Sequence, residues 1–331
     1  MQTTKTALVL GATGGIGGET ARQLRAAGWQ VRALARSATA AGDGLEWVRG
    51  DAMNRDDVLR AAAGCSVIVH AVNPPGYRRW AELVPPMLEN TIAAAVAQQA
   101  TIVLPGTVYN YGPDAFPTIA EDAPQHPRTR KGRIRVALEQ RLQAVAGKGC
   151  RVLIVRAGDF FGPKVGNSWF AQGLIKSGRP VTQIALPGAG IGHQWSYLPD
   201  VARTMVALLE RRSELRSFEN FHMAGHWDAD GEQMAAAIRR VVCRGGDAEP
   251  TLRRFPWWLI TLASPFVATL RELREMRYLW REPVRMSNAR LIQVLGTEPH
   301  TPLDEAVEAT LAGLGCLGVN APDESTAPRS S

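Results

Sequence analysis

Apolar residues follow two alternating patterns along the first half of the chain. Short runs of Val, Leu, Ile and Ala are typical of strands that are buried on both faces. Between these runs, apolar residues recur every three or four positions, as on one face of a helix. This alternation predicts a parallel, doubly wound α/β sheet of the Rossmann type. Strands are expected at 7–10, 31–35, 45–48, 67–70, 102–104 and 152–155, and helices at 17–27, 56–63, 80–98 and 134–146.

The pattern becomes less regular after residue 156, where Gly and Pro are frequent. A helix is predicted at 200–211, a strand at 218–223, and further helices up to about residue 314. The last residues are polar and rich in Pro and Ser, a composition that favours disorder. We expect a dinucleotide-binding Rossmann domain (1–155), a smaller C-terminal substrate-binding lobe (156–317) and a disordered tail (318–331).

A glycine-rich turn directly follows the first predicted strand. Gly11, Gly14 and Gly17 stand three residues apart, between that strand and an amphipathic helix. In a dinucleotide-binding turn, the first glycine permits the tight turn, the second lets the backbone approach the pyrophosphate, and the third lets helix and strand pack closely. The helix N-terminus offers N–H donors to the anion; the alternative is an ordinary turn. The predicted cofactor contacts are Gly11, Thr13, Gly14, Gly15, Ile16 and Gly17.

The end of the second strand indicates NADP, with NAD as the less favoured cofactor. An NAD site would carry Asp or Glu here to bind the ribose hydroxyls, but no acidic residue occurs between Gln30 and Ala41. Arg36 stands at this position, followed by Ser37. Both side chains suit the 2′-phosphate of NADP. The alternative is an exposed loop arginine without this role.

Two further strand ends are candidates for cofactor binding. Asp51 and Ala52 follow the third strand, where Asp51 can accept a hydrogen bond from the adenine amino group and Ala52 offers its amide. A plain turn aspartate is the alternative. The fourth strand ends at His70 and Ala71, where the ligand crevice of such a sheet opens. We expect Ala71 to line the cofactor site and His70 to be structural.

The chain is positively charged, and the distribution of this charge indicates which kind of molecule it binds. The chain has 331 residues, a net charge of +7 and a pI of about 9.6. No nucleic-acid-binding motif accompanies the excess of positive charge, so a nucleic-acid partner is not predicted. One dense basic cluster is expected to face an anionic cofactor or a small, anionic substrate; it comprises Arg128, Arg130, Lys131, Arg133 and Arg135.

Other features of the sequence argue against disulfides, a metal site and a membrane span. Four distant cysteines predict no disulfide and, with no signal peptide visible, favour the cytoplasm. His222 and His226 have no evident third ligand, so no metal site is predicted. The most apolar stretch, 255–270, is too short to cross a bilayer and is interrupted by Pro256 and Pro265. We expect a buried cap element there, with contact to a membrane surface as the alternative.

Taken in order, the motifs resemble those of an extended short-chain dehydrogenase/reductase, the NAD-dependent epimerase/dehydratase family. The resemblance covers roughly the first 225 residues and implies a Rossmann domain with a C-terminal substrate lobe. The C-terminal third carries no motif that can be transferred from the family. The matching segments lie at 11–17, 50–51, 70–71, 108–112, 156–163 and 197–202.

The catalytic motif departs from that of the family it resembles. The family carries Ser or Thr after the fifth strand and Tyr-x-x-x-Lys on the next helix, but this chain contains no Tyr-x-x-x-Lys. Thr107 fits the hydroxyl position, Lys131 stands where the tyrosine is expected and Arg135 where the lysine is expected. Arginine cannot act as an acid or base, so Arg135 is expected to bind ribose or phosphate. Lys131 can donate a proton if neighbouring cations crowd it, or it only binds anions; Tyr111 or Tyr109 are stand-ins for the missing tyrosine.

Two functions follow from these expectations. The first is an NADP-dependent oxidoreductase, or an epimerase/dehydratase-like enzyme, that acts on an unidentified carbonyl, hydroxyl or nucleotide-sugar substrate. The second is a dinucleotide-binding sensor or partner protein without turnover. The aromatic residues Trp169, Phe170, Trp195 and Tyr197 suit either a pocket lining or a core. A homodimer is compatible with both functions, and no membrane span is expected.

Overall fold

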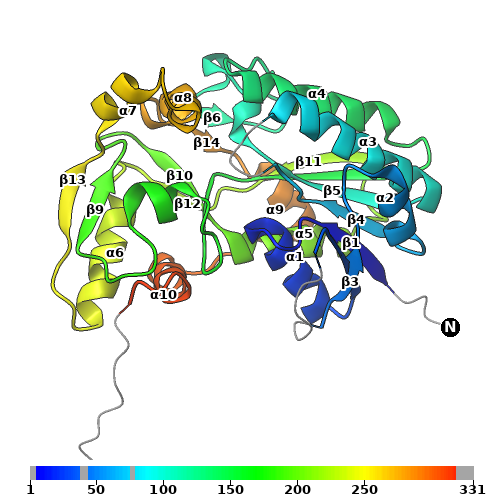
Figure 1. The fold of residues 1–331 in the computed structure, drawn as a ribbon, viewed down its shortest axis with the longest axis horizontal. Coiled ribbons are helices and arrows are strands. Elements are labelled where there is room, and N and C mark those ends of the chain that lie inside the picture. Colours follow the sequence, from blue (N-terminus) through cyan, green and yellow to red (C-terminus); the bar gives the residue numbers. More distant parts are fainter. Residues whose placement is uncertain (1–4, 38–43, 75–78, 318–331) are drawn as a thin grey trace, which may run out of the picture.

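The computed structural model describes residues 5–37, 44–74 and 79–317 (Figure 1). The predicted tail at 318–331 lies outside the described residues. Seven strands form one sheet in the order β11-β7-β5-β4-β1-β2-β3, and every neighbouring pair is parallel. The predicted Rossmann-type α/β fold is therefore confirmed. The strands are β1 (Thr6–Leu10), β2 (Gln30–Ala35), β3 (Glu46–Arg49), β4 (Val67–His70), β5 (Thr101–Gly106), β7 (Arg151–Arg156) and β11 (Phe218–His222).

Each central strand contributes to two hydrophobic cores. Leu8 and Leu10 of β1 face one core, and Ala7 and Val9 face the other. Because helices cover both faces, the strands are apolar without interruption instead of alternating with polar residues. Helices α2, α3 and α4 pack on the first face, and α1, α5 and α9 pack on the second (Figure 1). Their bounds are α1 (Gly15–Ala26), α2 (Arg55–Ala62), α3 (Trp80–Gln98), α4 (Arg130–Val145), α5 (Leu198–Glu210) and α9 (Ala289–Leu295).

The strand order reverses at β1. The chain runs from β1 outward to β2 and β3, then crosses back to β4 on the other side of β1. In sheets of this type, ligands bind at the carboxyl ends of the two strands that flank such a switch point. Gly11 and Ala71 directly follow these strands, and the Ala71 amide donates to the Leu10 carbonyl at 3.0 Å.

Part of the predicted C-terminal lobe packs with the central sheet. The strand expected at 218–223 is β11, the edge strand of the seven-stranded sheet, and α5 packs against α1. The sequence prediction placed both elements in the lobe at 156–317, because they follow the irregular segment. β11 lies parallel to β7, with Phe218 opposite Val152, and so provides partners for the backbone groups along the edge of β7.

The rest of the C-terminal lobe has its own core. A three-stranded sheet β12-β10-β8 and a strand pair β13-β9 surround a third cluster of apolar residues. Phe170, Trp195 and Tyr197 are buried in this cluster, so they fill the core instead of lining an open pocket. The elements are β8 (Asp159–Phe161), β9 (Gln183–Leu186), β10 (His193–Tyr197), β12 (His226–Asp228), β13 (Thr251–Arg254), α6 (Gln233–Arg244) and α10 (Leu303–Gly313).

The apolar segment at 255–270 is not the buried cap that the sequence predicted. It forms α7 (Trp257–Ala263) and the start of α8 (Ala268–Glu275), and α7 buries none of its residues. Among the described residues, no helix combines the length and apolarity needed to cross a membrane. The remaining short elements are η2 (Val108–Asn110), η3 (Pro113–Ala115), β6 (Thr118–Ile119), η4 (Phe170–Leu174), η5 (Met276–Trp280) and β14 (Arg285–Met286).

Candidate active site

The three glycines of the first turn have different neighbours. Gly11 has a φ of +88°, and a Cβ added to it would lie 2.6 Å from the Ala71 carbonyl oxygen. A Cβ on Gly17 would lie 2.2 Å from the Gly11 carbonyl oxygen. Both positions therefore require glycine for backbone packing. A Cβ on Gly14 would meet only the Gly11 carbonyl oxygen, at 3.3 Å, so the space above Gly14 is open.

This open space lies at the N-terminus of α1. Gly14 is the N-cap of α1, no side chain caps the helix, and its first turn holds no acidic residue. The first-turn N–H groups and the positive end of the helix dipole thus face outward together, an arrangement suited to a phosphate. Thr13 is exposed beside them. The carbonyl of Lys164 and the side chain of Leu198 lie within 3.6 Å of the Cβ position of Gly15, so the segment 162–165 borders this space.

The predicted adenosine contacts lie at the ends of the neighbouring strands β2 and β3. Arg36 and Ser37 are exposed, and no described carboxylate forms an ion pair with Arg36. The Asp51 carboxylate accepts a hydrogen bond from the Met53 amide at 3.0 Å, which is the turn role considered as the alternative. Its other oxygen makes no hydrogen bond to a described residue. The carbonyl of the buried Ala52 is held by the Asn90 side chain at 2.9 Å.

The segments that carry Thr107 and Lys131 are in contact, because α4 packs closely on η2. Thr107 directly follows β5, is half-buried, and donates from its hydroxyl to the Asn110 side-chain oxygen at 3.3 Å. A Cβ on Gly132 would lie 2.1 Å from the Tyr109 carbonyl oxygen, so the helix backbone contacts the segment after Thr107. Lys131 is the neighbour of this contact residue. The predicted hydroxyl and cation therefore belong to two segments that touch.

Lys131 and Arg135 lie on one face of α4. The helix begins at Arg130, four residues earlier than predicted, because the Thr129 hydroxyl caps it by accepting from the Gly132 amide at 2.9 Å. Lys131 is buried, and its Nζ lies 6.0 Å from the centre of the Trp80 ring. The Arg135 guanidinium lies 5.0 Å from the same ring. Two cations thus lie beside one aromatic ring.

The charge of Arg135 reaches the switch point of the sheet. His70, the last residue of β4, is buried, and its Nδ1 lies 2.7 Å from the Thr91 hydroxyl. Burial, and secondly the positive charge of Arg135, lower the pKa of His70 to about 3. His70 is therefore neutral near pH 7 and structural in role. Arg135 is therefore close enough to the last residue of β4 for its charge to act there.

Comparison with known protein families identifies the family of this chain. A model of the NAD dependent epimerase/dehydratase family matches residues 7–224, more than half of the chain. The chain belongs to this family. Membership confirms the resemblance seen in the motifs and the prediction of an enzyme, of the NAD(P)-dependent oxidoreductase or epimerase-like class.

Individual relatives are distant. The 3-diazoavenalumate denitrifying reductase of a Streptomyces species is 29% identical over 219 residues, which are 61% of this chain and 71% of that protein. A UDP-glucose 4-epimerase from Thermotoga maritima, solved with UDP-glucose, has a TM-score of 0.70 and 16% identity over 93% of this chain and 98% of that chain. A UDP-glucose 4-epimerase from Brucella ovis, solved with NAD, has a TM-score of 0.69 and 15% identity over 94% and 99%. At such identities the two solved structures show the fold alone.

Tyr111, one of the predicted catalytic residues of this epimerase/dehydratase family member, lies in the protein interior. Tyr111 is 0% exposed, and its hydroxyl lies 3.0 Å from Nε2 of His222. Burial raises the pKa of Tyr111, so the ring stays protonated. A tyrosine enclosed in this way has no exposed surface to offer to a substrate. The structure therefore gives no support to Tyr111 as the stand-in for the missing tyrosine, and that role stays a prediction.

Tyr111 instead belongs to a buried network that sequence reasoning missed. Arg156 lies over the Tyr111 ring at 5.1 Å, donates to Glu139 at 2.7 Å and donates to the Thr107 carbonyl. Burial, and secondly the charge of Arg156, lower the pKa of His222 to about 3. The network links β7, α4 and β11 to the segment that begins at Thr107. The only signal in the sequence was that Arg156 opens one of the matching motifs.

His226 lies beside two potential metal ligands that the sequence did not predict. Side-chain ligand atoms of His226, His300 and Asp200 lie within 4.8 Å of one another, whereas His222 is not part of this group. However, the Asp200 carboxylate already accepts from the Thr301 amide at 2.7 Å, from the Thr301 hydroxyl at 2.8 Å and from Arg203. We interpret the cluster as a structural tie between α5 and residue 301, because the carboxylate is neutralised by a guanidinium.

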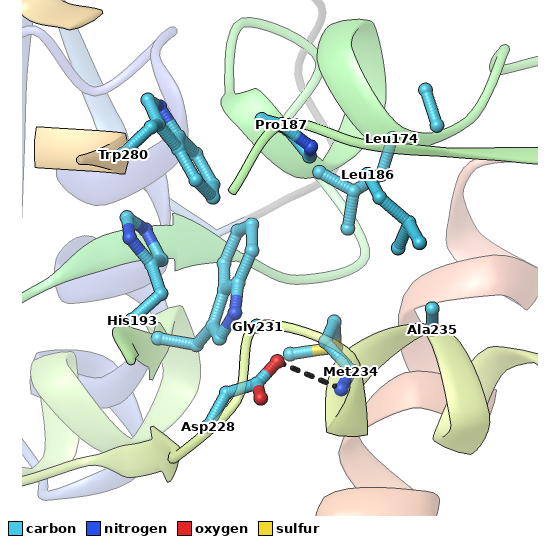
Figure 2. A pocket seen from close by; sticks show the side chains of 11 residues that line it. Leu174, Leu186, Pro187, His193, Asp228, Gly231, Met234, Ala235 and Trp280 are labelled. Atoms are coloured by element: carbon cyan, nitrogen blue, oxygen red, sulfur yellow. Dashed lines mark hydrogen bonds between the residues drawn. The ribbon is translucent and has the colours of Figure 1, made fainter. Parts of the chain in front are cut away.

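The cavity in Figure 2 lies in the C-terminal lobe, away from the glycine turn. Its volume is about 10 Å³, which at most admits one water molecule. His193 stacks on Trp280 at 3.8 Å and bonds to Asp159 at 2.9 Å. The Asp228 carboxylate accepts from the Met234 amide at 3.1 Å and caps α6. His193, Asp159 and Asp228 are engaged in these contacts, and the volume is too small for a substrate, so we interpret the cavity as a gap in the packing of the lobe core.

Proposed function

We propose that this protein is an NADP-dependent reductase of a small carbonyl compound, with Lys131 as the proton donor. The observation that supports the proposal best is the pair of cations, Lys131 and Arg135, beside the ring of Trp80. They occupy the positions where the family carries Tyr and Lys, beside the segment of Thr107. A relative that is named as a reductase adds support for this direction of reaction.

The residues around the glycine turn fit a dinucleotide. The open space above Gly14 and the uncapped N-terminus of α1 suit the pyrophosphate. Arg36 and Ser37 are accessible to a 2′-phosphate, and the free oxygen of Asp51 suits the adenine amino group. Bound in this place, a reduced nicotinamide supplies a hydride to the carbonyl carbon of the substrate.

The side chains of this chain would then orient and protonate the carbonyl oxygen. The Thr107 hydroxyl donates a hydrogen bond that fixes this oxygen. Lys131 donates a proton to it as the hydride arrives, which yields the alcohol and a neutral amine that regains its proton from water. Arg135 remains charged throughout, since a guanidinium is not deprotonated in proteins. It therefore binds a ribose or an anionic group of the substrate.

The test is the consumption of NADPH with a panel of small carbonyl compounds, anionic and neutral, and with nucleotide sugars. Lys131→Met retains most of the side-chain volume and should lower kcat about 10²–10⁴-fold, as for loss of a general acid. Lys148→Met, at an exposed lysine, is the matched control and should leave kcat unchanged. Unaltered kcat in Lys131→Met contradicts the role of Lys131. Tight NADPH binding without turnover on any substrate would instead favour the sensor.

A further inference from the structure

A group of exposed apolar side chains stands out on α7 and the turn that follows it. Nine large apolar side chains are exposed among the described residues, and five of them fall within 258–267. Isolated exposed apolar residues are ordinary, but a contiguous group marks an interaction surface. The apolar patch comprises Trp258 (68% exposed), Leu259 (45%), Leu262 (69%), Phe266 (88%) and Val267 (44%).

The helix holds these side chains in one stripe. Trp258 and Leu262 are four residues apart and lie one turn above the other on α7. The amides of Phe266 and Val267 both donate to the Ala263 carbonyl, so the backbone continues to turn and adds Phe266 one turn further. Since α7 buries none of its residues, the apolar stripe does not serve the core of this chain.

The orientation of α7 is fixed by its first residue. The Trp257 indole N–H donates to the Pro187 carbonyl at 2.8 Å, and its ring lies 4.8 Å from Phe255 and 5.8 Å from Trp169. One side of the helix is thus tied to the C-terminal lobe, and the patch is presented on the other. Figure 1 shows α7 and α8 together at the outer edge of this lobe.

Four arginines flank the patch along the chain. Arg253 and Arg254 precede α7, and Arg271 and Arg274 follow on α8, which also carries Glu272 and Glu275; all four arginines are exposed, and Arg274 donates to the Ser264 hydroxyl at 3.1 Å. None of them forms an ion pair with a described side chain. Exposed Trp, Phe and Leu beside arginines are the composition of elements that lie in the headgroup region of a bilayer and attract anionic lipids. We propose that the apolar patch and these four arginines bind the surface of a membrane that contains anionic lipids.

Other occupants fit the patch less well. The tail at 318–331 contains one valine and no leucine, isoleucine, methionine or aromatic residue, so it cannot cover the patch. A symmetric contact with a second copy would bring the same four arginines of each copy into one interface, where Glu272 and Glu275 supply only two counter-charges per copy. A negative lipid surface complements both the apolar stripe and the charge. No described helix could span the bilayer, so the contact is with its surface.

The helix that follows the patch contacts the start of α4. The carboxylate of Glu275, at the end of α8, accepts a hydrogen bond from the Arg130 amide at 2.6 Å. Arg130 is the first residue of α4, and Lys131 is the second. The helix that carries Arg271 and Arg274 thus ends in contact with the helix that carries Lys131.

Sedimentation of the full-length protein with vesicles tests the proposal. We expect binding to vesicles of phosphatidylcholine mixed with phosphatidylglycerol, and at least roughly tenfold weaker binding to phosphatidylcholine alone. The double variant Arg253→Gln/Arg254→Gln should weaken binding to the mixed vesicles about 30-fold, at about 1 kcal/mol per arginine. Leu262→Ser/Phe266→Ser should weaken it by roughly 100-fold.

Matched variants keep the test specific. Ile292→Ser removes an exposed apolar side chain elsewhere, and Lys148→Gln/Arg55→Gln removes two exposed charges elsewhere; both should bind like the wild type. All altered side chains are exposed, so circular dichroism and urea unfolding midpoints should not change. Equal binding to neutral and mixed vesicles, or absence of binding, overturns the proposal. A dimer that Leu262→Ser/Phe266→Ser converts to monomer, without vesicle binding in the wild type, assigns the patch to a second copy and also overturns it.

Discussion

Substitution of Gly14 by valine separates cofactor binding from folding. Gly14 has φ −91° and ψ 169°, extended values that any residue adopts. A Cβ there meets only one atom, the Gly11 carbonyl oxygen at 3.3 Å. Loss of a favourable N-cap residue costs about 1 kcal/mol. The valine side chain nevertheless enters the space at the start of α1 that is suited to a pyrophosphate, so Gly14→Val should fold and fail to bind dinucleotide.

The size of the effect follows from linkage between binding and stability. At a cofactor concentration about 100 times Kd, binding stabilises the native state by about 2.7 kcal/mol. If the valine weakens binding roughly 100-fold, the same concentration contributes only about 0.4 kcal/mol. For a chain of this length the upward shift in Tm should fall from roughly 5 °C to below about 1 °C.

Thermal unfolding with and without NADPH measures both quantities. Gly17→Ala is the matched comparison, since its Cβ would lie 2.2 Å from the Gly11 carbonyl oxygen. That variant should lose stability even without cofactor, because the backbone has to move. If Gly14→Val unfolds at a similar temperature and retains the full shift with NADPH, the glycine turn is only a turn and the reasoning is refuted.

Three further predictions concern charged and titrating groups. Arg36→Ala should abolish a preference of about 10–100-fold for NADPH over NADH in fluorescence titrations; equal affinity in the wild type would contradict the choice of NADP. Glu139→Gln should destabilise the protein by about 3–5 kcal/mol in urea unfolding, because it leaves the buried Arg156 guanidinium uncompensated; a loss below about 1 kcal/mol would show that the pair does not support the fold. His70 has a pKa of about 3 in the folded protein, so the unfolded chain binds more protons below pH 6.5, and its neutral form should account for about 2 kcal/mol of stability lost between pH 7 and pH 5. His70→Asn should remove that part of the pH dependence, and an unchanged slope would show that His70 does not cause it.

Local features of the sequence were sufficient for much of the fold. Runs such as 7–10 and 67–69 are apolar on both faces, as expected for strands that are covered by two layers of helices. The glycine turn could be interpreted because each glycine acts within a few residues of itself. The order of strands and helices also predicted approximately where β1 to β4 end. It therefore predicted that Arg36 and Ala71 directly follow strands.

Properties that depend on contacts between distant segments could not be predicted from local sequence patterns. The local sequence suggested Tyr111 as a proton donor. In the structure, β11 places His222, which is 111 residues away in the sequence, at the Tyr111 hydroxyl. The pairing of β11 with β7 also removed two elements from the predicted C-terminal lobe. No local pattern encodes which edge of a sheet receives a later strand, since that choice depends on the unpaired backbone groups that remain there.

The apolar segment at 255–270 illustrates the same limit. Its composition alone determined that it would seek an apolar environment and that it was too short to cross a bilayer. Whether that environment is the core depended on whether the lobe had space for it. Trp257 occupies the available contact with Trp169 and Phe255, so the opposite side of α7 remains exposed. The sequence by itself thus determined the hydrophobic character of each element, and only the tertiary structure decided which of these surfaces are buried, because burial depends on the packing of elements far apart in the chain.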